Sequence, residues 1–93
     1  MKIRISCDGK YEAQKLSSIL FIKDSNETYI TAILNIVDNE LVVALKDKSA
    51  HSVLLKNDTH VEIFADFIQS VIDKEHKIIS TTIFGEDIEI TKG

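Results

Sequence analysis

Hydrophobic residues between Lys48 and Lys77 recur at alternating steps of four and three, which is the period of one helix face. No Gly or Pro interrupts this stretch. The pattern predicts one helix of roughly thirty residues, which would be about 45 Å long and would exceed the width of a small domain. The positions that carry the period are Ala50, Leu54, Asn57, Val61, Phe64, Ile68 and Val71.

A cap within this stretch is the alternative. Asn57-Asp58-Thr59 has the residue types of a helix N-cap, which would split the stretch into a short helix and a longer helix from about His60. The apolar phase continues unchanged across these residues, whereas a break would usually shift it. We therefore favour the uninterrupted helix.

Strand patterns flank the helical ones, and the fold class follows from their order. Period-two alternation and β-branched residues indicate strands, and polar pairs such as Asp38-Asn39 indicate the turns between them. The sequence shows no internal repeat. We predict an α+β fold in the order β-α-β-β-α-β-β, with an antiparallel sheet and both helices on one face. The other expected elements are strands over 2–7, 28–37, 40–45, 77–84 and 88–90 and a first helix over 10–21.

The hairpin expected over 28–45 is apolar on both faces. Two helices can cover only one face of a small sheet, so the second face needs another cover. A homodimer partner is the simplest cover, and a carboxy-terminal segment folded across that face is the alternative.

Composition restricts the class of protein. A chain of 93 residues predicts a single domain over 1–93. A net charge of −4 with Arg4 as the one arginine argues against direct strong nucleic-acid binding. Cys7 is the one cysteine, so no internal disulfide is expected. No apolar run approaches the roughly twenty residues of a membrane span, and the first residues alternate unlike a signal peptide, so we expect a cytoplasmic protein without membrane association.

The long helix, projected at about 100° per residue, has two distinct flanks beside its core stripe. An acidic surface consists of Asp58, Glu62, Asp66 and Asp73 and is interpreted either as a solvated face or as a contact for a basic partner. On the other flank, Ile63 and Phe67 widen the apolar arc beyond what a sheet-packed stripe needs, so we expect them to pack on the first helix or on another protein. The candidate partner-binding residues on this helix are Asn57, His60, Ile63, Phe64 and Phe67.

Residues that would carry chemistry do not form a recognisable pattern. His51, His60 and His76 are nine and sixteen positions apart, which directs them to different helix faces rather than to one ion. Asp8-Gly9-Lys10 is a capped turn rather than a phosphate loop, which needs more glycine. We expect no catalytic residues, no metal and no cofactor.

The chain resembles the small dimer-forming subunit of the KEOPS complex over about residues 1–76. The resemblance lies in the spacing from Ile5 through Ala13 to Leu20, in the segment 38–43 (DNELVV), and in Asn57 followed by Val61, Phe64 and Ile68. It implies a non-catalytic homodimer that docks by its helices onto a catalytic subunit, in the machinery that makes threonylcarbamoyl-adenosine in tRNA. Val53 stands where the family often has a basic residue, and the segment 78–90 has no counterpart.

Two rival functions follow from the residues. The acidic surface would suit a small inhibitor of viral or mobile-element type, which mimics nucleic-acid phosphates and blocks a nucleic-acid enzyme. An enzyme whose site forms between two protomers is the other. The overlong helix, the doubly apolar hairpin and the missing reactive cluster favour a non-catalytic association module over both.

Overall fold

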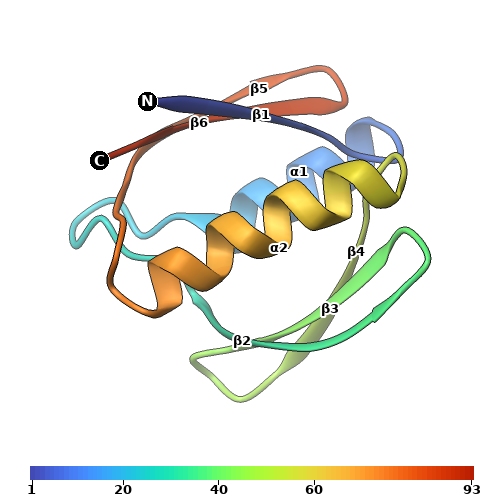
Figure 1. Ribbon diagram of the computed structural model, residues 1–93. Coiled ribbons are helices and arrows are strands. Elements are labelled where there is room, and N and C mark those ends of the chain that lie inside the picture. Colours follow the sequence, from blue (N-terminus) through green and yellow to red (C-terminus); the bar gives the residue numbers. More distant parts are fainter.

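The computed structural model describes residues 1–93 and contains two helices and six strands (Figure 1). The α+β class is therefore confirmed, but the element order is β-α-β-β-β-α-β-β. The elements are β1 (Lys2–Ser6), α1 (Lys10–Leu20), β2 (Ile30–Val37), β3 (Glu40–Leu45), β4 (Ala50–Leu54), α2 (Asp58–Ile72), β5 (Ile78–Phe84) and β6 (Asp87–Lys92).

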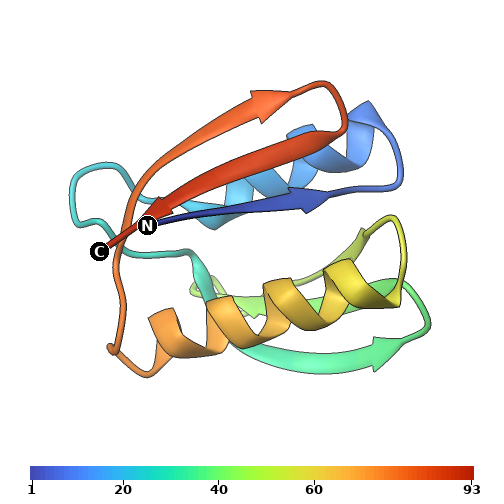
Figure 2. The same cartoon turned by 45° about the horizontal axis from the view of Figure 1, so that its top comes forward.

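The strands form two antiparallel three-stranded sheets, and the expected single sheet is wrong. The first sheet has the order β1-β6-β5 and the second has the order β2-β3-β4. The helices lie between the two sheets rather than on one face of either (Figures 1 and 2). Helix α1 contacts β4, β5 and β6, while α2 contacts β1 and β2. Each helix thus shares its apolar face between both sheets.

The expected long helix is also wrong, because residues 50–54 form strand β4. Alternation buries Val53 and Leu55, and the strand pairs with β3 from Ala44↔Ala50 to Glu40↔Leu54. The open edge of the β2-β3 hairpin therefore decided the conformation of a segment whose local pattern fitted either structure. Helix α2 has 15 residues, which gives a length of roughly 22 Å.

The cap alternative was correct about Asn57 but not about what precedes it. The Asn57 side-chain oxygen accepts a hydrogen bond from the backbone N–H of His60, at 3.2 Å, and so begins α2. A strand, not a short helix, comes before the cap. No helix of the structure is long and apolar enough to cross a membrane.

The chain consists of two βαββ units that form an internal structural repeat. The sequence does not reveal this repeat. Strand β4, helix α2 and strand β5 begin 48 residues after β1, α1 and β2 respectively. The units exchange their first strands, because β1 pairs with β6 and β4 pairs with β3. The equivalent starting residues are Lys2 and Ala50, Lys10 and Asp58, and Ile30 and Ile78.

Backbone hydrogen bonds join the two units at their point of exchange. Cys7 and Leu55, which are equivalent residues, form an isolated bridge between the sheets. The N–H of Asp8 donates to the carbonyl of Leu54 at 2.9 Å, and the N–H of Lys56 donates to the carbonyl of Ser6 at 3.0 Å. Each of these two bonds is the repeat equivalent of the other, so the junction has approximate two-fold symmetry.

The hydrophobic core follows the same symmetry. All twenty residues of the core cluster except Leu45 and Val71 form pairs that are buried at equivalent positions of the two units. Neither unit encloses a core by itself, since each helix packs chiefly on strands of the other unit. The pairs are Ile5 and Val53, Cys7 and Leu55, Ala13 and Val61, Leu16 and Phe64, Ile19 and Phe67, Leu20 and Ile68, Ile30 and Ile78, Leu41 and Ile88, and Val43 and Ile90.

Candidate functional site

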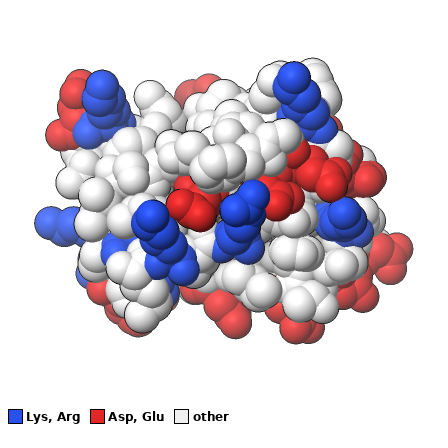
Figure 3. Space-filling model, turned by 90° about the horizontal axis from the view of Figure 1, so that it is seen from above, with Lys and Arg blue, Asp and Glu red and all other residues white.

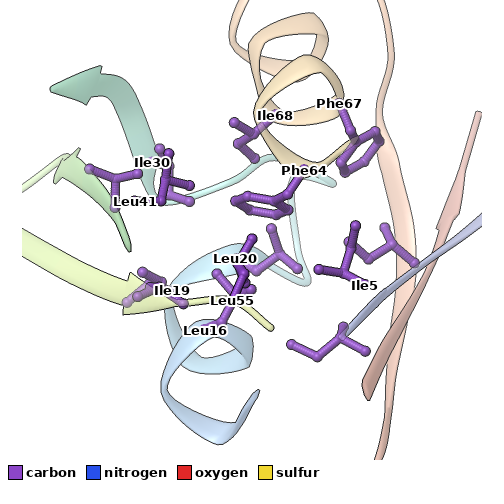
Figure 4. Packing of buried hydrophobic residues seen from close by; sticks show 14 of the residues in the cluster. Ile5, Leu16, Ile19, Leu20, Ile30, Leu41, Leu55, Phe64, Phe67 and Ile68 are labelled. Carbon is purple, nitrogen blue, oxygen red and sulfur yellow. The ribbon is translucent and has the colours of Figure 1, made fainter. Parts of the chain in front are cut away.

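Phe64 and Phe67, two of the candidate partner-binding residues, lie inside the molecule. Phe64 is fully buried and Phe67 is 5% exposed. Figure 4 shows Phe64 directed toward Leu20 of α1, while Phe67 lies toward the strands of the first sheet. Lys92 of β6 lies over the Phe67 ring, with its Nζ 5.7 Å from the ring centroid. Ile63 remains on the surface, with 40% exposure.

Asn57 and His60, the polar members of the predicted partner surface, have structural contacts. Asn57 caps α2, and the Nδ1 atom of His60 accepts a hydrogen bond from the backbone N–H of Ser6 at 3.2 Å. In the other unit, Glu12 takes the equivalent place, and its Oε1 accepts from the N–H of Leu54 at 2.9 Å. Each helix therefore holds the end of the first strand of the opposite unit by a side chain in its first turn.

The acidic surface of α2 is open to solvent. Asp58, Glu62, Asp66 and Asp73 are all exposed, and none of them takes part in an ion pair of the structure. The one side-chain hydrogen bond of this group is donated by Gln69 Nε2 to Asp73 Oδ1, at 3.1 Å. Four carboxylates without internal cations leave a negative ridge along the outer side of α2.

Strand β2 forms an edge of the second sheet and is apolar. It carries no charged residue from Ile30 to Val37, and Leu34, Ile36 and Val37 are 55%, 46% and 53% exposed. Edge strands usually carry charges or prolines that prevent pairing with another chain. The pairing of β2 with β3 has two register shifts, but β2 carries neither a charged residue nor a proline. The unpaired backbone N–H and C=O groups of this edge therefore lie beside the exposed apolar side chains of Leu34, Ile36 and Val37.

The outer face of the second sheet has few charges as well. Residues that alternate with the buried Leu41 and Val43 point outward, and they include the half-buried Val42 and Ala44. The carboxy-terminal strands β5 and β6 belong to the first sheet, where β6 pairs with β1, so they do not provide the alternative cover expected for this face. Exposed Ala50 of β4 extends the uncharged area next to Ala44.

The first sheet differs sharply on its outer face, where basic and acidic residues are interspersed (Figure 3). Arg4 Nε lies 3.0 Å from Asp87, and Lys2 Nζ lies 3.5 Å from Glu89. A hydrogen bond from the Ser6 hydroxyl, supported by Arg4, holds the pKa of Asp87 below its ordinary value. These charged residues form ion pairs with each other within the sheet. We therefore interpret this face as one exposed to solvent.

Strand β5 is the repeat equivalent of β2 and, like β1, an edge of the first sheet. It also exposes apolar residues, at Ile79, Ile83 and Phe84. The guanidinium of Arg4 covers the Phe84 ring at 4.8 Å from its centroid. The edge at β5 is therefore partly covered by charge from its own sheet, unlike the edge at β2.

Residues capable of chemistry are held apart or shielded. Cys7 is fully buried, and burial, followed by the nearby Glu12, raises the pKa of its thiol to about 12. His51, on β4, lies 3.2 Å from the Ser49 hydroxyl, whereas His60 is on α2 and His76 follows it. No group of three or more His, Cys, Asp or Glu comes together as a metal site would require.

Two surfaces thus remain open to a partner, the apolar edge at β2 and the acidic ridge of α2. The sequence pattern identified the acidic residues and the apolar hairpin, but it gave no signal that β2 would be an edge strand, because edge position depends on the pairing of β4 with β3. Comparison with protein family models, with curated proteins and with solved structures finds no match to this chain.

Proposed function

We propose that this protein is a non-catalytic association subunit that forms a homodimer through strand β2. The observation that carries the proposal is the uncharged, apolar edge at Ile30–Val37 beside an outer sheet face with few charges. A second copy adds its own β2 in antiparallel orientation, so that both edges are satisfied by main-chain hydrogen bonds. Such a contact uses the same patch on both chains and closes as a two-fold dimer.

The surface chemistry supports this edge over its repeat equivalent. Pairing two β2 strands buries Leu34, Ile36 and Val37 without removing any charge from water. Pairing through β5 would require the Arg4 guanidinium to leave Phe84 or to be buried with it. Charge burial is the larger cost, which favours β2 as the dimer edge.

Replacing Leu34 with lysine should weaken the dimer at least about tenfold, because the loss of one buried leucine alone accounts for about 1.5–3 kcal/mol. Light-scattering mass over a dilution series measures the monomer–dimer equilibrium. Ile79→Lys is the matched control, since Ile79 is a similarly exposed residue of the β5 edge. A wild-type chain that stays monomeric at all concentrations, or a dimer sensitive to Ile79→Lys and not to Leu34→Lys, contradicts the proposal.

Docking of the dimer onto a catalytic subunit completes the proposed function. The resemblance to the KEOPS dimer-forming subunit supports a partner in tRNA modification, although β4 interrupts the order strand, helix, hairpin and helix that the resemblance implies. The exposed side of α2, which combines Ile63 with the acidic ridge, is suited to a partner that is basic around a small apolar contact.

A second candidate function is inhibition of a nucleic-acid enzyme by phosphate mimicry. Asp58, Glu62 and Asp66 favour it, because they are exposed, lack cations and repeat at successive turns of α2. Salt distinguishes the two functions: binding by mimicry weakens steeply as ionic strength rises, whereas an apolar contact does not. The measurement is the affinity of the chain for a partner captured from the native host, at about 50 and about 500 mM salt.

A further inference from the structure

A pocket of ≈ 320 Å³ lies where three segments distant in sequence meet. The loop before β2, the turn after β3 and the segment after α2 form its walls, and Ile30, Val71 and Ile72 form its apolar part. The volume lies at the lower end of the range for small-molecule sites. The pocket involves neither the β2 edge residues Leu34–Val37 nor the acidic ridge.

The charge of the pocket is opposite to that of the chain. Lys46, Lys74 and Lys77 line it together with one carboxylate, Glu27. The chain as a whole has a net charge of −4, so three ammonium groups around one pocket are a local reversal of sign. Clustered cations in a concave site concentrate anions there.

Glu27 marks the position at which two of these cations converge. Its Oε2 atom lies 3.0 Å from Lys46 Nζ, and its Oε1 atom lies 3.2 Å from Lys74 Nζ. The hydrogen bonds from Lys46 and from Lys74 hold the pKa of Glu27 below its ordinary value, so it is charged at neutral pH. One carboxylate cannot neutralise three ammonium groups, and Lys77 has no ion pair.

Uncharged polar groups also line the pocket. The Nδ1 atom of His76, which lines it, is buried and has no hydrogen-bond partner. Buried nitrogens of this kind are usually satisfied, so this one is a hydrogen-bonding group that the protein itself leaves without a partner. The exposed Ser25 and Thr31 contribute hydroxyl groups to the lining.

We propose that this pocket binds the phosphomonoester group of a small soluble molecule. Lys46, Lys74 and Lys77 contact the phosphate oxygens, and the dianion displaces Glu27 from the two lysines that it bridges. A phosphate dianion competes with Glu27 better than a second carboxylate would, because it brings two charges and three acceptor oxygens to three ammonium groups. The apolar part of the pocket receives the remainder of the molecule.

The test is an amide chemical-shift titration of the full chain with inorganic phosphate and with glycerol phosphate at constant ionic strength. Saturable shifts are expected at the pocket residues. Glu27→Gln should tighten binding by about tenfold, because it removes the internal competitor and its like charge. Glu86→Gln is the matched control and should have no effect, since Glu86 forms a similar exposed ion pair with Lys56, at 3.1 Å, outside the pocket.

Lys77→Ala provides a second variant that keeps every ion pair of the structure, and it should weaken phosphate binding severalfold. The proposal is overturned by shifts that grow linearly without saturation, by equal affinities of Glu27→Gln and Glu86→Gln, or by unchanged affinity of Lys77→Ala. Vesicles that contain phosphatidic acid form the arm for a lipid headgroup. Binding to these vesicles without binding of either free phosphate also overturns it.

Discussion

Replacing Phe67 with serine is expected to cost the isolated chain about 3–5 kcal/mol of unfolding free energy, whereas Ile63→Ser should cost about 1 kcal/mol or less. Phe67 is 5% exposed and belongs to the core cluster, while Ile63 is 40% exposed. The total stability of a domain of this size is 5–15 kcal/mol, so the Phe67 variant loses a large part of it. Urea unfolding followed by circular dichroism measures both losses.

The two variants form their own control, because both residues lie on the same side of α2 and differ mainly in burial. If Ile63 and Phe67 instead belonged to a partner interface, replacing both with serine would leave folding nearly intact and abolish association. Equal and small losses of unfolding free energy for the two variants would show that Phe67 lies on the surface. Ile63 and Phe67 would then again be candidates for a partner interface.

The helix that carries these residues was predictable only in part. Residues from Val61 to Val71 keep the helical period, and α2 indeed buries Val61, Phe64, Ile68 and Val71. The period continues upstream through Leu54 and Ala50 by coincidence, while Val53 and Leu55 fit a strand equally well. Long-range pairing with β3 decides between them, and no local pattern contains that information.

The internal repeat was hidden for a different physical reason. Equivalent core positions need only hydrophobic side chains of compatible total volume, so Leu16 can correspond to Phe64 and Cys7 to Leu55. Equivalent polar contacts also differ chemically, as in Glu12 and His60, which both accept a backbone N–H. Symmetry is thus retained in the backbone while identity is lost in the side chains.

The repeat bears directly on how the protein can associate. Two equivalent free edges, at β2 and β5, would let one chain pair head to tail with the next and form an open polymer. Charge breaks this equivalence, because Arg4 covers Phe84 at the β5 edge and no charge lies along β2. The open edge at β2 and the guarded edge at β5 favour a closed β2–β2 dimer over a fibre built from β2–β5 contacts.

Division of the chain between Asp47 and Lys48 should abolish cooperative folding of either half, while an equimolar mixture of residues 1–47 and 48–93 should recover it. The first half keeps the β2-β3 hairpin but loses β6, the partner of its β1, and the second half loses β3, the partner of its β4. An isolated two-stranded hairpin is marginal in water, and α1 packs chiefly on β4, β5 and β6 of the other half rather than on the β2-β3 hairpin. Circular dichroism and amide spectra of each half and of the mixture provide the measurement.

The exchange of first strands is the reason for expecting complementation rather than two independent small folds. Each half supplies one strand to the sheet of the other, and the bonds of Asp8 to Leu54 and of Lys56 to Ser6 close the junction only when both halves are present. Cooperative unfolding of residues 1–47 as a monomer would contradict this dependence. A symmetric dimer of residues 1–47 would support it, because the β1 strand of each copy would then take the position that β4 occupies beside β3 in the whole chain.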